Sequence, residues 1–99
     1  MIIPPPLSEE AVKKFLAEHP QWSVDKGALV RTFEAPAFLR GIDFVDRVAK
    51  LVETADHHPD IDIRWRKVTL RFITHDAGNA ITENDTRLAG ECDLIFATL

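Results

Sequence analysis

The stretch from Thr54 to Asp62, TADHHPDID, places two adjacent histidines, His57 and His58, directly before a proline. A third histidine, His75, ends the apolar segment KVTLRFITH. Histidine readily donates and accepts a proton near neutral pH, so these positions are candidates for general acid–base catalysis. The residues alone leave three interpretations open: a proton-transfer site, a metal site, or polar residues at a helix end.

The spacing argues against a metal site. Adjacent histidines on a helix point about 100° apart around its axis, and the sequence contains neither a zincin motif nor a pair of cysteines. A histidine pair before a proline is more often a solvated helix end than a catalytic site, although Glu53, Asp56 and Asp60 crowd the same corner. We therefore predict no metal, and the residues taken alone favour helix capping over proton transfer.

The composition is that of a single globular domain covering residues 1–99, with 45% hydrophobic and 28% charged residues. The net charge of −4 argues against a nucleic-acid or anionic-membrane surface, and no apolar segment is long enough to span a bilayer. The single cysteine, Cys92, excludes an intrachain disulfide and fits the reducing cytoplasm. Residues 1–7, MIIPPPL, lack the basic start of a signal peptide, so we expect an extended leader there.

Hydrophobic periodicity predicts three helices and four strands. Ser8 is a good N-cap for a first helix that His19 and Pro20 end. Gly27 supplies a hairpin turn, and Thr82 caps a last helix. The expected elements are helix 8–19, strands 21–24 and 28–34, helix 35–58, strands 61–65 and 67–75, loop 76–80 and helix 82–99. This order, α-β-β-α-β-β-α, predicts an α+β fold with a four-stranded antiparallel sheet and helices packed on one face.

The long helix 35–58 carries two apolar stripes. The stripe expected to face the sheet contains Phe38, Ile42, Val45, Ala49 and Val52. The second stripe is displaced by roughly 100–160° around the axis, and it contains Phe44, Val48, Leu51 and Ala55. An uncovered stripe is an aggregation liability, and a short strand leaves a sheet edge that a second copy can pair. We predict a homodimer, or a homotetramer if both contacts are used; the alternative is a monomer whose flanking helices cover both stripes.

The segment HHPDIDIRWRKVTLRFITHDAGNAITENDTRLA resembles the central signature of the pterin-4a-carbinolamine dehydratases. The matching features are His-His-Pro at 57–59, an aromatic residue and a valine at Trp65 and Val68, Thr-His at 74–75, the glycine loop at Gly78, and Asp85 in the last helix. The resemblance extends upstream through the long helix to Trp22. Two positions depart from the pattern: Trp65 stands where tyrosine is usual, and GNAIT replaces the more common Gly-Gly-Leu-Thr.

The resemblance implies dehydration of a 4a-hydroxytetrahydropterin to a quinonoid dihydropterin, which recycles the pterin cofactor of aromatic amino acid hydroxylases. No redox step occurs, so the resemblance implies no cofactor for this chain. Hydroxide is a poor leaving group near neutral pH, and the reaction therefore needs a general acid and a general base. All three histidines are present, which favours the enzyme. The competing hypothesis is a non-catalytic binding, assembly or transcription-cofactor module on the same fold.

The resemblance also implies roles for individual residues. His57 and His75 would act as acid and base at the departing hydroxyl, and His58 would contact the pterin ring and help with the nitrogen proton. Substrate contacts are expected at these histidines and at Asp56, Thr74, Asp76 and Trp22.

Three of the expected roles have structural alternatives. Trp22 would stack on the pterin or seal the core. Glu53 would orient His57 or be an ordinary exposed helix acid. Asp85 would support a histidine, or close a capping box with Thr82.

Overall fold

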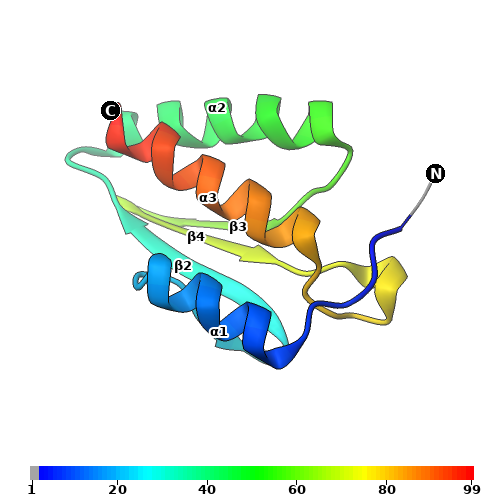
Figure 1. Cartoon of the computed structure of the whole chain (residues 1–99). Coiled ribbons are helices and arrows are strands. Elements are labelled where there is room, and N and C mark those ends of the chain that lie inside the picture. The colour runs from blue at the N-terminus through cyan, green and yellow to red at the C-terminus, as the bar shows by residue number, and fades with distance from the viewer. Residues whose placement is uncertain (1–2) are drawn as a thin grey trace.

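The protein is described by a computed structural model covering residues 3–99 (Figure 1). The elements are α1 (Glu9–Glu18), β1 (Ser23–Asp25), β2 (Ala28–Glu34), α2 (Phe38–Ala55), β3 (Asp60–Arg64), β4 (Lys67–Phe72), a 3-10 turn η1 (His75–Ala77) and α3 (Glu83–Ala97). The predicted order α-β-β-α-β-β-α is confirmed. No helix within residues 3–99 is long and apolar enough to cross a membrane.

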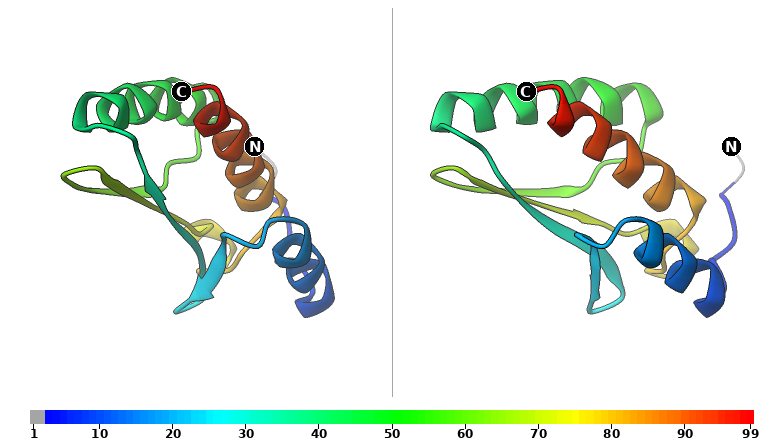
Figure 2. Two further views of the ribbon diagram at one scale, coloured as in Figure 1. Left: turned by 90° about the vertical axis from the view of Figure 1, so that its left-hand side faces the viewer. Right: turned by 60° about the vertical axis from the view of Figure 1, so that its left-hand side comes forward.

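The four strands form one antiparallel sheet in the order β1-β2-β4-β3. The three helices lie on the same side of this sheet, as predicted (Figure 2). The β1–β2 hairpin turns through Lys26 and Gly27, which both have positive φ, as a tight two-residue hairpin turn requires. β4 alternates buried apolar residues with more exposed polar ones, and its outer neighbour β3 is an edge strand.

The expected leader at residues 1–7 is described only from residue 3 onward, and residues 1–2 lie outside the described part. Residues 3–7 form no regular secondary structure. The backbone N–H of Leu7 donates to the Ile81 carbonyl at 2.8 Å, which anchors this segment beside the start of α3.

The face of α2 that meets the sheet was predicted wrongly. Phe44 and Val48 of the second stripe are buried, whereas Phe38 and Ile42 of the stripe expected to face the sheet are 45% and 37% exposed. Val52 is the member of the expected stripe that is buried. α3 packs against α2, so the side chains of α2 that lie between α3 and the sheet are buried, and the first two turns of the other stripe, at Phe38 and Ile42, point outward. Both stripes have helical spacing, and only the position of α3 decides between them.

A close contact between α2 and the sheet reinforces this orientation. A Cβ added at Gly41 would lie 3.6 Å from Val68 and 3.5 Å from Ala35, so the helix backbone lies almost directly on the neighbouring side chains. The core that forms beneath it contains Leu29 and Phe33 of β2, Val68, Leu70 and Phe72 of β4, Phe44 and Val48 of α2, and Leu88 and Cys92 of α3.

We expect Phe44→Ala to lower the free energy of unfolding by about 3–5 kcal/mol, since it removes a fully buried aromatic ring. Phe38→Ala should cost less than about 1 kcal/mol, because nearly half of that side chain is in solvent. Urea unfolding at dilutions where the chain is monomeric measures both. A larger loss for Phe38→Ala would show that the helix is oriented as the sequence alone suggested.

The buried thiol of Cys92 makes the free energy of unfolding depend on pH in the alkaline range. Its burial, with a smaller effect of the Asp93 and Glu91 carboxylates, raises the pKa of Cys92 from 9.0 to about 12. Between these values the unfolded thiol ionises while the folded thiol keeps its proton. The folded state therefore binds more protons, and its stability falls as pH rises.

We expect the free energy of unfolding to fall above pH 9 by up to about 1.4 kcal/mol per pH unit from this one group. The chain contains no tyrosine, which simplifies the alkaline titration. Cys92→Ala is the matched control. Its free energy of unfolding should lack the contribution of the thiol to the dependence on pH, even if the variant is less stable overall. Identical slopes between pH 9 and 11 would contradict the assignment.

Candidate active site

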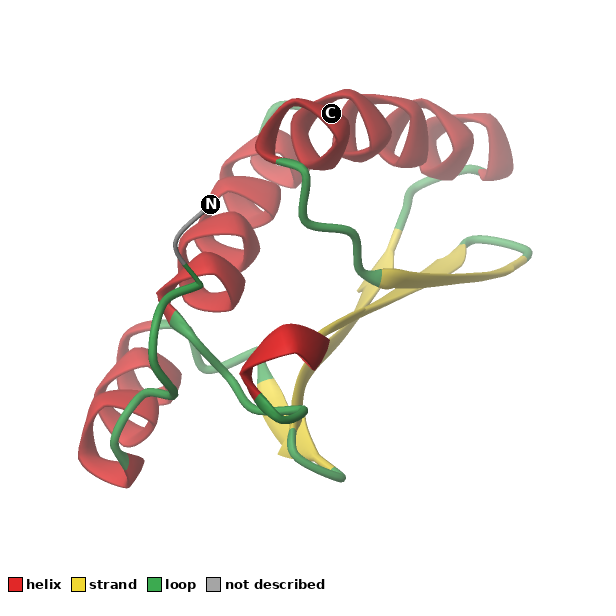
Figure 3. Cartoon of the chain, turned by 90° about the vertical axis from the view of Figure 1, so that its right-hand side faces the viewer, coloured by secondary structure: helices red, strands yellow, loops and turns green. Residues whose placement is uncertain are grey.

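The histidine pair lies just beyond α2 and not within it. The helix ends at Ala55, three residues earlier than predicted, because Asp56 adopts a left-handed conformation with φ of 52°. Aspartate tolerates this conformation better than most residues. Backbone hydrogen bonds from Asp56 to Glu53 and from His57 to Val52 close the helix end. The turn directs the segment at residues 56–59 down toward β3, on the side where η1 also lies (Figure 3).

His57 is held by a buried carboxylate from α3. Its Nε2 lies 2.6 Å from Oδ1 of Asp85, and the Asp85 side chain is fully buried. The imidazole also stacks on Phe72 with the ring centroids 6.3 Å apart. An ionised carboxylate only accepts hydrogen bonds, so Nε2 of His57 carries the hydrogen and Nδ1 keeps its lone pair when the ring is neutral.

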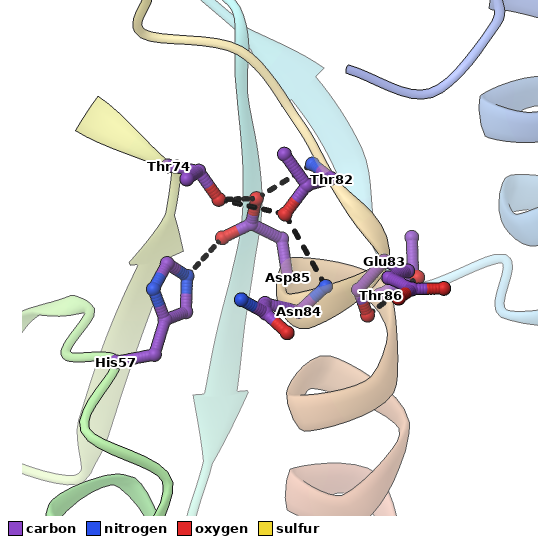
Figure 4. Close-up of polar contacts among 7 residues, drawn as sticks. All are labelled: His57, Thr74, Thr82, Glu83, Asn84, Asp85 and Thr86. Carbon is purple, nitrogen blue, oxygen red and sulfur yellow. Dashed lines mark hydrogen bonds and ion pairs between the residues drawn. The ribbon is translucent and has the colours of Figure 1, made fainter. Parts of the chain in front are cut away.

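Asp85 also organises the start of α3 (Figure 4). Its Oδ2 accepts from the Thr82 backbone N–H at 2.8 Å and from the Thr74 hydroxyl at 2.7 Å. Because Thr74 donates to Asp85, the 2.8 Å contact between the two threonine hydroxyls must be donated by Thr82. The Thr82 oxygen in turn accepts from the Asn84 N–H. The capping box and the histidine contact, posed as alternatives for Asp85, are thus made by the same carboxylate.

Glu53 pairs with the other histidine of the pair. Oε1 of Glu53 lies 2.7 Å from Nε2 of His58, and both side chains are largely exposed. The contact expected between Glu53 and His57 is absent, because the turn at Asp56 points His57 toward α3 and leaves His58 beside the last turn of α2. Glu53 therefore contacts His58 and not His57, which was the predicted partner.

His75 lies beyond the end of β4, in a short turn. The sequence predicted that the strand would continue to this residue. The strand ends at Phe72, and Thr74 forms an isolated bridge with Ala80 that closes the loop between them. His75 begins η1 inside this loop, and its Nδ1 lies 2.7 Å from Oδ1 of Asn79. Sequence reasoning missed Asn79. The available signal was an asparagine directly after a glycine, where both residues can adopt positive φ.

These side chains surround one cavity of about 260 Å³. Its lining brings together six of the predicted site residues, Asp56, His57, His58, Thr74, His75 and Asp76, and adds Ile73, which was not predicted. Trp22 is not among them. It is 3% exposed, packs on Phe33 and Phe72, and donates from Nε1 to Asp93 at 2.8 Å, so it seals the core.

A larger cavity of about 830 Å³ lies between α1 and α3. Three polar groups that line it already pair with one another, because Asp93 accepts hydrogen bonds from His19 and Arg31. The smaller cavity has three histidines whose second ring nitrogens make no protein hydrogen bond among the described residues. Unpaired nitrogens are what proton transfer requires, so we take the smaller cavity as the candidate active site. Within residues 3–99, no group of three or more His, Cys, Asp or Glu side chains is arranged to hold a metal ion.

Comparison with known proteins gives the chemical context. The model of the pterin 4 alpha carbinolamine dehydratase family matches residues 5–95. The chain belongs to this family.

Members of the dehydratase family match nearly the whole chain. A protein of Mycolicibacterium smegmatis, provisionally named pterin-4-alpha-carbinolamine dehydratase, is 50% identical over 91 residues, covering 92% of this chain and 96% of its own. A protein of Chloroflexus aurantiacus with the same provisional name is 48% identical over 92 residues, covering 93% and 98%. A solved structure, the transcriptional coactivator/pterin dehydratase from Brucella melitensis, superposes with a TM-score of 0.86 at 28% identity, covering 92% and 98%.

We expect Asp85→Asn to lower the free energy of unfolding by about 1–3 kcal/mol, because the amide cannot accept from His57, Thr74 and Thr82 together. Asp76→Asn is the matched control. It alters an exposed carboxylate of the same cavity and should stay within about 0.5 kcal/mol of the parent. Chemical denaturation compares the two, and equal stabilities would contradict the central position given to Asp85.

Proposed function

We propose that this chain catalyses dehydration of a 4a-hydroxytetrahydropterin to a quinonoid dihydropterin, recycling the pterin used by aromatic amino acid hydroxylases. Family membership supports the substrate class. The observation that supports this cavity as the site is the presence of three histidines around it, each hydrogen-bonded to the protein through one ring nitrogen. The unpaired thiol of Cys92 fits a cytoplasmic location.

The reaction divides into two proton transfers. The bond between the bridgehead carbon and the hydroxyl oxygen breaks, and a general acid supplies the proton that makes the leaving group water. A general base takes the proton from the adjacent ring nitrogen, whose electron pair forms the new carbon–nitrogen double bond. Both transfers suit imidazole near neutral pH. In this proposal His57 and His75 face the hydroxyl, and His58 lies beside the ring nitrogen.

The remaining polar groups of the cavity would orient the substrate. Asp56, Thr74 and Asp76 line it and offer oxygens to the amide edge of a pterin. The Thr74 hydroxyl is already committed as a donor to Asp85, so it can only accept from a ligand. Trp22 has no part in this proposal, because it is buried in the core.

A second candidate function is a protein-binding module. The Brucella melitensis structure is described as a transcriptional coactivator as well as a pterin dehydratase. In this chain, α2 and the edge strand β3 expose large apolar side chains that a partner could cover, at Phe38, Leu39, Ile42, Ile61 and Ile63. Stable capture of a different protein by a chain that leaves the carbinolamine unchanged would favour this candidate.

The same surface supports the proposal of a homodimer or homotetramer. β3 has one unpaired edge, and Ile61 and Ile63 on it are each 38% exposed. Pairing β3 with its own copy would satisfy the free backbone groups, while packing of α2 against α2 would cover Leu39.

Light scattering at micromolar concentration should give two or four times the chain mass of 11.2 kDa. Leu39→Glu should disrupt the helix contact without disturbing the fold, because this side chain is 75% exposed. If the parent protein is a tetramer, the variant should be a dimer paired through β3. If the parent is a dimer and the variant remains one, the two copies are held by the β3 edge alone. A mass near that of one chain for the parent protein would refute the proposal.

Purified protein should accelerate loss of the carbinolamine without added metal or nucleotide, and a chelator should not slow it. His75→Ala should lower the rate by about 10²-fold or more, the usual scale for a positioned acid–base group. His19→Ala is the control, because this fourth histidine contacts Asp93 in the other cavity. Full activity of His75→Ala would refute the assignment of the site.

A further inference from the structure

Asn79 contacts His75, although the proposed dehydration does not itself need an asparagine at this position. We infer that Asn79 is a positioning residue that keeps the hydrogen of His75 on Nδ1 and thereby presents the Nε2 lone pair to the substrate. This inference rests on the proposed function and adds a positioning residue to it.

The direction of the hydrogen bond follows from the atoms involved. Nδ1 of His75 lies 2.7 Å from Oδ1 of Asn79. An amide oxygen can only accept, so Nδ1 must carry the hydrogen. A neutral imidazole has one hydrogen on its two nitrogens, and Nε2 of His75 therefore holds a free lone pair. The asparagine selects one of the two tautomers of the ring.

The loop backbone holds Asn79 in place for this contact. Asn79 has φ of 59° and follows Gly78, with φ of 76°. The backbone N–H groups of Gly78 and Asn79 both donate to the His75 carbonyl, at 3.1 and 3.3 Å, and Thr74 pairs with Ala80 at the base of the loop. The chain therefore folds back so that the Asn79 side chain meets the ring four residues earlier.

Backbone geometry alone does not call for asparagine here. Glycine adopts positive φ at less cost than any other residue, so it would suit this turn better. Asparagine tolerates the conformation and also adds an amide that glycine lacks. The Asn79 contact is thus a feature of this chain that depends on the side chain.

The three histidines have different partners. His57 and His58 each bond through Nε2 to a carboxylate, of Asp85 and Glu53 respectively. His75 bonds through the opposite nitrogen to a neutral amide. A carboxylate stabilises the positive charge of a protonated ring, and an amide oxygen carries no net charge to do so. His75 is therefore the one histidine of the three whose partner orients the ring without contributing a charge.

The other charged groups around the cavity do not replace Asn79. Asp56 and Asp76 line the cavity with the histidines, and within the described residues neither carboxylate makes a hydrogen bond to an imidazole. The asparagine amide is the partner that the structure gives His75.

Two substitutions separate the amide acceptor from the turn. Asn79→Gly removes the acceptor and relaxes the positive φ, so the fold should be at least as stable. Asn79→Asp keeps an acceptor in the same place and also tolerates this conformation. We expect Asn79→Gly to lower kcat about 10- to 100-fold with little change in KM, which is part of the roughly 10²- to 10⁴-fold contribution of a positioned acid–base group. Asn79→Asp should restore most of kcat and move the limb of the pH profile that belongs to His75 to higher pH.

Long-range ¹H–¹⁵N spectra of the histidine side chains test the tautomer without any assay of activity. The parent protein and Asn79→Asp should show His75 with the hydrogen on Nδ1, and Asn79→Gly should lose this preference. The inference is overturned if the parent shows the hydrogen on Nε2, or if Asn79→Gly matches the parent in both spectrum and kcat. A parent protein with the expected tautomer but no dehydration would refute the proposed function and leave the hydrogen-bond assignment standing.

Discussion

The arrangement of the site depends on one buried carboxylate. Asp85 accepts hydrogen bonds from three segments of the chain: His57 after α2, Thr74 after β4, and the Thr82 backbone at the start of α3. A fully buried charge is costly unless such partners surround it. Each segment is therefore held relative to the other two, and removing any one donor would leave the charge less satisfied.

This constraint explains how the candidate catalytic histidines can be held in place although they lie beyond a helix end and in a loop. His57 follows a helix and His75 begins a 3-10 turn, both of which are mobile locations in many proteins. Here the loop between Thr74 and Ala80 is closed by backbone pairing, and Asp85 connects it to His57 through Thr74. Beneath the site, Phe72 contacts His57 on one side and the core on the other.

Local patterns in the sequence predicted the local structure well. Thr82 and Asp85 form the predicted capping box, and the alternation of β4 places Val68, Leu70 and Phe72 in the core. Three features could not be predicted in the same way: which face of α2 is buried, the pairing of Glu53 with His58 instead of His57, and the contact between Asn79 and His75. The first depends on where α3 packs, the second on the left-handed turn at Asp56, and the third on the Thr74–Ala80 bridge that closes the loop.

In the proposed site, three histidines face one pterin while the fourth does not. Histidine side-chain ¹⁵N spectra recorded during titration with a stable dihydropterin, chemically close to the product, test it most directly. We expect the resonances of His57, His58 and His75 to shift together with one affinity, while that of His19, which is hydrogen-bonded to Asp93 in the other cavity, stays unchanged. A titration that moves His19 and leaves the other three in place would contradict it.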